Sequence, residues 1–107
     1  MYANGDGVTK DSVEAVKWYR KASDQGNAEA QSLLGWMYAN GEGVTKDSAE
    51  ALKWYQKAAD QGNADAQYNL GGMYANGEGA PKDSAEALKW YQKAADQGDA
   101  EAQSLLG

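Results

Sequence analysis

The sequence predicts an all-α solenoid built from helix-turn-helix repeats of 36 residues. Residues 47–62, DSAEALKWYQKAADQG, recur unchanged at 83–98 and with a few changes at 11–26. One tryptophan marks each copy, 36 residues from the next: Trp18, Trp54 and Trp90. A fixed period of this length is typical of solenoids, in which each repeat buries its apolar face against its neighbours.

The chain is expected to open inside a helix. Residues 1–4 (MYAN) recur at 37–40 and 73–76, where they form the last turn of a first helix type. Residues 5–10 (GDGVTK) combine two glycines with polar side chains, a composition that favours a loop. We expect this loop to lead into the first copy of a second helix type.

The second helix type is the one that contains the repeated tryptophan. In its middle copy, Asp47 is a strong N-cap, Glu50 is placed to complete a capping box, and Gly62 supplies a left-handed end. The apolar residues fall at helical spacing over an arc of roughly 160°, which is wide enough to be covered from two sides. They are Ala51, Leu52, Trp54, Tyr55, Ala58 and Ala59.

The repeated tryptophans and the tyrosines that follow them are expected in the core, because they recur unchanged on this apolar arc. These residues are Trp18, Tyr19, Trp54, Tyr55, Trp90 and Tyr91. Charged and amide side chains occupy the rest of each helix surface. A charged helix face of this kind is usually a solvated one, so it indicates no chemistry.

The first helix type is predicted from Ala28 to about Asn40, with Asn27 as its N-cap and Gly41 at its end. Gly35 lies in the middle, where glycine costs about 1 kcal/mol relative to alanine. We interpret it as room for the close approach of a neighbouring helix. The inward-facing residues are Ala30, Leu34, Met37 and Tyr38. Residues 99–107 begin the same helix type once more.

Composition narrows the function before any motif does. At 107 residues, we expect 1–107 to form one domain of about three repeats, cut within the first helix type at both ends. Sixteen acidic and ten basic residues give a net charge of −6, which argues against nucleic-acid and anionic-membrane partners. The apolar runs are too short to cross a bilayer, and the first residues do not resemble a signal peptide. A soluble domain of unknown compartment is expected.

No catalytic, cofactor or metal site is predicted. The chain has no His and no Cys, which removes the commonest general base, the thiolate metal ligands and disulfides. The loop with Gly41 and Gly43 superficially resembles a phosphate loop, but it follows a helix and lacks the third glycine. Glu14, Glu50 and Glu86 recur identically, as helix capping predicts and a single active site does not.

These patterns together resemble a known family. The run L-G-x-x-Y at residues 34–38, then N-G-x-G-V, then A-x-x-W-Y-x-K-A-A-x-Q-G, is similar to the Sel-one-like repeat, a branch of the tetratricopeptide superfamily. The resemblance covers the whole chain and implies a right-handed superhelix whose first-type helices line a concave surface. It also implies an adaptor that binds a protein or peptide, in the bacterial cytoplasm or periplasm. Some cysteine-rich members act on β-lactams, but this chain lacks their cysteines.

Differences between the repeats indicate where a partner would bind. Residues 1–36 and 37–72 differ at nine of 36 positions, and the drastic changes cluster: Ser32/Tyr68, Leu33/Asn69 and Trp36/Gly72. Aromatic residues beside Leu and Asn suit a protein-binding surface. The predicted partner-binding stripe is Glu29, Ser32, Leu33, Trp36, Asn40, Asp65, Tyr68 and Asn69. Alternatively, Trp36 packs on an adjacent repeat and Tyr68 fills the space left by Gly72.

The two ends of the chain suggest self-association. Joined tail to head, the last and first residues nearly restore one helix of the first type, so one molecule could continue the superhelix of the next. Such a contact does not close and would give open fibres. The predicted end residues are Tyr2, Leu105 and Leu106. Alternatives are a fragment of a longer protein, an engineered near-consensus scaffold and, more weakly, a β-lactam-binding enzyme.

Overall fold

The chain folds into helices alone over the part that the structure describes. The computed structural model describes residues 5–98, with side chains from Asp11 onward. These residues form five helices and no strand: α1 (Gly5–Asp24), α2 (Ala28–Asn40), α3 (Ser48–Asp60), α4 (Ala64–Asn76) and α5 (Ser84–Asp96). The predicted all-α class is confirmed.

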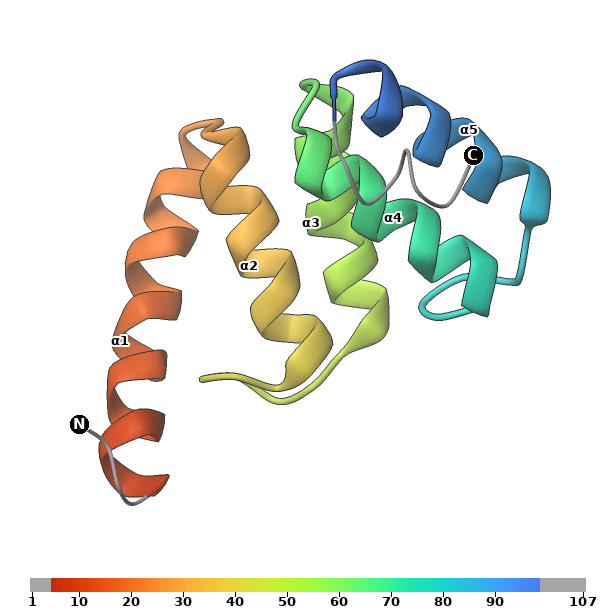
Figure 1. The fold of residues 1–107 in the computed structure, drawn as a ribbon. Coiled ribbons are helices and arrows are strands. Elements are labelled where there is room, and N and C mark those ends of the chain that lie inside the picture. Colours follow the sequence, from red (N-terminus) through yellow and green to blue (C-terminus); the bar gives the residue numbers. More distant parts are fainter. Residues whose placement is uncertain (1–4, 99–107) are drawn as a thin grey trace.

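The helices follow one another as a stack of antiparallel pairs (Figure 1). Each packs mainly on its neighbours in sequence: α2 lies against α1 and α3, and α4 lies against α3 and α5. The α2–α3 pair and the α4–α5 pair are successive copies of the 36-residue unit. The predicted solenoid of helix-turn-helix repeats is therefore the fold that forms.

The helices of the second type begin where the sequence predicts, but only half of the capping box forms. The Asp47 side chain accepts a hydrogen bond from the Glu50 backbone N–H at 3.1 Å. The reciprocal bond is missing because the Asp47 N–H already donates to the Tyr38 carbonyl oxygen at 2.9 Å. Glu50 instead pairs with Lys53, at 3.1 Å between Oε2 and Nζ. The backbone N–H that the capping box requires is therefore bonded to the preceding helix.

The helices of the first type have both predicted ends. Asn27 accepts from the Ala30 backbone N–H at 2.8 Å, and α2 then runs to Asn40. Gly41 follows with φ of 70°, a left-handed conformation in which a side chain is strained. Its N–H donates to the Met37 carbonyl oxygen and so closes the helix end.

The loop predicted at residues 5–10 is wrong, because this segment is the first part of α1. In the next repeat the corresponding loop is held by neighbouring helices. The Asp47 N–H donates to the Tyr38 carbonyl oxygen, and Gly43 lies so close to α1 that a Cβ there would be 2.4 Å from the Ser12 carbonyl oxygen. At residues 5–10 no described helix other than α1 itself makes such a contact, and the segment is helical.

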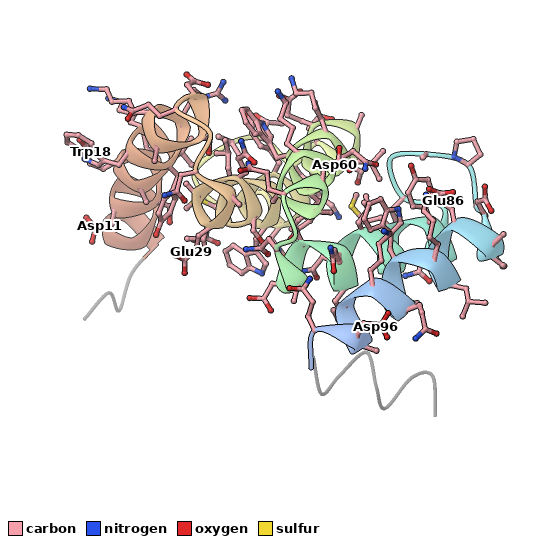
Figure 2. The ribbon with its side chains drawn as sticks, turned by 90° about the horizontal axis from the view of Figure 1, so that it is seen from above. Asp11, Trp18, Glu29, Asp60, Glu86 and Asp96 are labelled. Atoms are coloured by element: carbon pink, nitrogen blue, oxygen red, sulfur yellow. The ribbon has the colours of Figure 1, made fainter. Side chains whose placement is uncertain are left out.

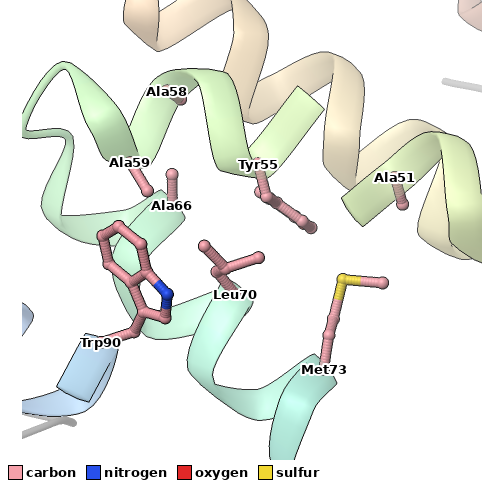
Figure 3. Packing of buried hydrophobic residues seen from close by; sticks show 8 residues of the cluster. All are labelled: Ala51, Tyr55, Ala58, Ala59, Ala66, Leu70, Met73 and Trp90. Carbon is pink, nitrogen blue, oxygen red and sulfur yellow. The ribbon is translucent and has the colours of Figure 1, made fainter. Parts of the chain in front are cut away.

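Two apolar clusters form the core, and α3 contributes to both. The first joins α1, α2 and α3 through Val16, Leu34, Met37 and Trp54. The second joins α3, α4 and α5, and Figure 3 shows its side chains turned toward one another. Its members are Ala51, Tyr55, Ala58, Ala59, Ala66, Leu70, Met73 and Trp90. As predicted, the helix with the wide apolar arc is covered from two sides.

Trp18 departs furthest from the predicted core, in which Tyr19 and Tyr91 are only partly buried. Its side chain projects from α1 away from the other helices (Figure 2) and is 60% exposed, whereas Trp54 and Trp90 are 6% and 5% exposed. Trp54 is covered by α1 and α2, whereas Trp18 belongs to neither apolar cluster of the described residues. The Lys21 ammonium lies over the Trp18 ring, 4.9 Å from its centroid.

Gly35 allows the close helix approach that the sequence predicts. A Cβ at this position would lie 3.0 Å from Cδ1 of Tyr55 on α3. The next unit repeats the contact, since a Cβ at Gly71 would lie 2.9 Å from Cδ1 of Tyr91 on α5. Each unit therefore places a tyrosine ring directly against a glycine of the paired helix.

A chain of glutamine side chains joins each unit to the next, which sequence reasoning did not anticipate. The Gln61 amide donates to Oε1 of the buried Gln31 at 2.9 Å, and Gln31 donates to the Ser23 carbonyl oxygen at 3.2 Å. The same two bonds recur one period later, from Gln97 to Gln67 at 2.8 Å and from Gln67 to the Ala59 carbonyl at 3.2 Å. Buried amides need such partners.

Candidate partner-binding groove

A groove of about 350 Å³ lies between α2 and α4. Residues of α2 and α4 form its walls, and residues of α3 and α5 form its floor. The loop after α4 contributes to its edge. The lining side chains that reach solvent are mainly aromatic and amide: Trp36, Asn40, Tyr68, Asn69, Glu78 and Tyr91. A hollow of this size that combines aromatic rings with polar side chains can take a side chain of a bound peptide.

The difference between Trp36 and Gly72 shapes the groove. Trp36 forms one wall and is 47% exposed. At the equivalent position one period later stands Gly72, where a Cβ would meet only the Tyr91 hydroxyl, at 3.5 Å. A second tryptophan at this point would occupy the space. The groove therefore exists because the two units differ here.

Two tyrosines form the aromatic side of the groove. The rings of Tyr68 on α4 and Tyr91 on α5 are 5.6 Å apart between centroids and tilted by 50°. Such tilted pairs are favourable beyond the area they bury. Burial, and secondarily the neighbouring Tyr68, raises the pKa of Tyr91. Its hydroxyl therefore stays protonated near neutral pH and is available as a hydrogen-bond donor.

The Tyr55 side chain forms part of the groove floor, and its hydroxyl does not act as a base. Its side chain is 3% exposed and packs against Gly35. Burial, together with the negative charge of Asp65, raises the pKa of Tyr55 to about 12. The phenol is consequently neutral over the physiological pH range and serves as part of the packed floor.

Two asparagines are fixed on the groove walls by their own helices. The Asn40 amide nitrogen donates to the Trp36 carbonyl oxygen at 2.8 Å, one turn earlier on α2. The Asn69 amide nitrogen donates to the Asp65 carbonyl oxygen at 2.8 Å in the same manner on α4. Both side chains are thus held in position before any ligand arrives, which reduces the entropy lost on binding.

The predicted stripe is only partly brought together. Trp36, Asn40, Tyr68 and Asn69 all line the groove. Three further predicted residues are absent from the groove lining although their side chains reach solvent: Glu29, Leu33 and Asp65.

Ser32 corrects the prediction, because it is 9% exposed and not available on an exposed stripe. It lies one turn before Gly35 on the same helix face, against which Tyr55 of α3 packs. The close approach at Gly35 explains why a short side chain there is covered. Its counterpart Tyr68 is long enough to reach the groove.

Among the polar and aromatic groove residues that reach solvent, sequence reasoning missed Asn76, Glu78 and Tyr91. Asn76 could have been found, since it occupies the same position in its repeat as Asn40. Tyr91 was assigned to the core by its apolar arc, but it is only partly buried, beside the open position at Gly72. Glu78 belongs to a loop, whose placement depends on the fold.

The described residues contain no feature of a metal site or a membrane span. No group of three or more potential metal ligands occurs among residues 5–98. Within the same part of the chain, none of the helices combines the length and apolar character needed to cross a membrane.

The stacked helix pairs and the groove between them define the chain as a helical-repeat protein of the solenoid class. The Sel1 repeat model matches residues 1–27, 28–63 and 64–99, and the chain therefore belongs to the Sel1 repeat family. Sel1 repeat proteins are generally non-catalytic scaffolds for protein interaction. No curated protein matches the chain.

Solved structures agree with this assignment. A protective antigen of uropathogenic Escherichia coli with an SLR fold is 42% identical, with a TM-score of 0.86, over 88% of this chain and 20% of its own. A Sel1 repeat protein from Oxalobacter formigenes is 46% identical, with a TM-score of 0.81, over 84% of this chain and 37% of its own. This chain thus spans well under half the length of either protein.

A third structure lies at lower identity. Cysteine rich protein B of Helicobacter pylori is 29% identical, with a TM-score of 0.80, over 84% of this chain and 68% of its own. The present chain has no cysteine. The shared helical architecture therefore does not depend on the residues for which that neighbour is named.

Proposed function

We propose that this chain is a non-catalytic scaffold that binds a peptide segment of a partner protein in the groove between α2 and α4. The observation that carries the proposal is the convergence of Trp36, Tyr68, Asn40 and Asn69 on one hollow of about 350 Å³. Aromatic anchors of this kind contribute most of the energy at protein interfaces. The role agrees with the general role of Sel1 repeat proteins.

The repeats provide a double substitution that removes the two aromatic anchors of the groove and uses only residues that the fold already accepts. In the double variant Trp36→Gly and Tyr68→Ser, each position receives the residue that stands one period away. We expect peptides from an immobilised library of capped nonapeptides to bind the natural chain. Binding to the double variant should be at least about 30-fold weaker, because both aromatic anchors are lost.

The matched control is Leu33→Asn, which also exchanges a residue for its counterpart, Asn69. Leu33 is 40% exposed and lies outside the groove lining. This variant should bind the same peptides as the natural chain. Peptides that bind the natural chain and the groove variant equally well would contradict the proposal, provided that circular dichroism shows both to be folded.

A second candidate function is head-to-tail self-association, which the outer helices favour. Trp18 on α1 is 60% exposed beside a hollow of about 300 Å³ whose lining comes from α1 alone. Leu88 on α5 is 56% exposed, whereas its counterpart Leu52 packs against the cluster that contains Trp90. In this proposal, Leu88 of one molecule packs beside Trp18 of the next. Their counterparts within the chain are Leu52 and the cluster that contains Trp90. The predicted end residues Tyr2, Leu105 and Leu106 lie outside the described residues.

Light scattering over a concentration series tests this assembly. The apparent mass of the natural chain should rise with concentration, and Leu88→Glu should abolish the rise by placing a charge in an apolar contact. Thr45→Glu, on an exposed loop residue, adds the same charge and should leave the rise unchanged. A natural chain that stays monomeric throughout would rule the assembly out.

A further inference from the structure

The two fixed asparagines of the groove present hydrogen-bond acceptors. Each donates its amide nitrogen to a helix carbonyl oxygen, from Asn40 to Trp36 and from Asn69 to Asp65. A backbone carbonyl can only accept, so the nitrogen must be the atom that faces it, and the amide orientation is fixed. No described residue donates to either Oδ1 atom. Two carbonyl oxygens therefore remain for a ligand.

Glu78 adds a negative charge at the edge of the same groove. Its counterpart Glu42 accepts a hydrogen bond from the Ser12 hydroxyl at 2.8 Å. The Glu78 side chain is exposed, and its carboxylate has no hydrogen-bond or ion-pair partner among the described residues. No lysine or arginine belongs to the groove lining. The polar groups of the groove thus include acceptors and one carboxylate but no cation.

Trp36 differs from the other tryptophans in having no cation over its ring among the described residues. Lysine ammonium groups lie 4.9 to 5.7 Å from the ring centroids of the other three: Trp18, Trp54 and Trp90. Each of those rings already makes a cation–π contact with a lysine of its own helix. The negative face of the Trp36 ring, which forms the groove wall, remains open to a cation from outside.

We infer that the peptide segment bound in this groove inserts a cationic side chain, preferably arginine, between Trp36 and the tyrosine pair. The inference rests on the proposed function and names the chemistry of its ligand. A guanidinium has five N–H donors in a planar fork and stacks on aromatic faces. The acceptors of Asn40, Asn69 and Glu78 match those donors, and the rings match its plane. The net charge of −6 attracts basic segments over a longer range.

The test uses the capped nonapeptide library and the groove variant described above. Peptides that bind in a groove-dependent manner should be enriched in arginine and lysine. Replacing that arginine by citrulline, which keeps the shape and removes the charge, should weaken binding about tenfold by calorimetry. The arginine peptide should also lose more affinity than the citrulline peptide when the salt concentration is raised.

Glu78→Gln measures the contribution of the carboxylate. This substitution should weaken the binding of the arginine peptide about threefold and leave the affinity for the citrulline peptide unchanged. The matched control Glu42→Gln changes the same residue one period earlier, where the side chain already bonds to Ser12, and should change neither affinity.

The outcomes separate the two proposals. Groove-dependent peptides without arginine or lysine enrichment, or equal binding of the arginine and citrulline forms, would overturn the cation inference and leave the proposed function intact. A library with no groove-dependent peptide at all would overturn both.

Discussion

At the scale of single residues, burial depends on where a unit stands in the array. Trp54 and Trp18 occupy the same position in their units, with lysines over both rings. Trp54 is nevertheless 6% exposed and Trp18 60% exposed, because only Trp54 has α1 and α2 in front of it. A nearly identical local sequence therefore does not determine the energy that a side chain contributes.

Trp54→Ala should lower the free energy of unfolding by about 3–5 kcal/mol, the usual cost of removing a buried tryptophan. Trp18→Ala should cost less than about 1 kcal/mol, because most of that ring is already in water. Urea unfolding followed by circular dichroism measures both values. Equal destabilisation would mean that the outer face of α1 is covered in solution.

The raised pKa of Tyr55 predicts a loss of stability at alkaline pH. Its pKa rises from 10.0 to about 12 on folding, so the folded state keeps the proton when the unfolded chain has lost it. The associated stability is complete below pH 10 and is lost as the pH rises from 10 to 12. The loss should amount to roughly 2–3 kcal/mol.

The variant Tyr55→Phe is the control, since it lacks the titrating group and keeps the ring against Gly35. The natural chain should lose more stability than this variant between pH 9 and pH 12 in urea unfolding. Parallel curves for the two proteins would show that the hydroxyl does not carry the effect.

At the scale of the helices, adjacent glycines on α4 have opposite roles. A Cβ at Gly71 would lie 2.9 Å from the Tyr91 ring and 3.1 Å from the Ala87 carbonyl oxygen of α5. A Cβ at Gly72 would meet only the Tyr91 hydroxyl, at 3.5 Å. The first glycine lets two helices approach, and the second opens the groove.

Alanine substitutions separate these roles. Gly71→Ala should destabilise the chain by about 1–3 kcal/mol, because α5 must move away from α4. Gly72→Ala should stabilise it by up to about 1 kcal/mol, because alanine favours the helix and no backbone atom opposes it. Thermal unfolding of the two variants gives the comparison. A shift of the same sign in both would refute the distinction.

The sequence predicts the elements better than it predicts the surface between them. The N-cap residues, the glycine ends and the close approach at Gly35 follow from local chemistry, and the structure agrees with them; the capping box forms only in part. The segment at residues 5–10 does not, because its loop form depends on helices that must lie beside it. Half of the predicted stripe reaches the groove, whereas Ser32 is buried, since side-chain length and the path of α3 decide exposure there.

At the scale of the whole molecule, the described helices differ in how many neighbours cover them. The helix α3 belongs to both core clusters, whereas α1 belongs to one. In a solenoid, stability is approximately a sum of unit and nearest-neighbour terms. The interior units should therefore open less often than the outer ones.

Hydrogen exchange followed by mass spectrometry should show the slowest backbone amides in α3 and distinctly faster exchange in α1. The difference arises because α3 loses contacts on two sides when it opens and α1 loses them on one. Protection of α1 equal to that of α3 at low protein concentration would contradict this view of an array with weaker ends.

The glutamine chain determines how a protein of this kind can lengthen. Within one unit a glutamine donates to a second glutamine, as from Gln61 to Gln31, and the second donates to a carbonyl oxygen of the preceding unit, as from Gln67 to Ala59. A duplication of residues 37–72 would therefore insert a unit that already carries the partners for both of its neighbours. The new unit would present Gly72 where Trp36 now stands, so its groove would be wider and without an indole wall. One genetic duplication would thus change valency and specificity together, with no new contact to evolve.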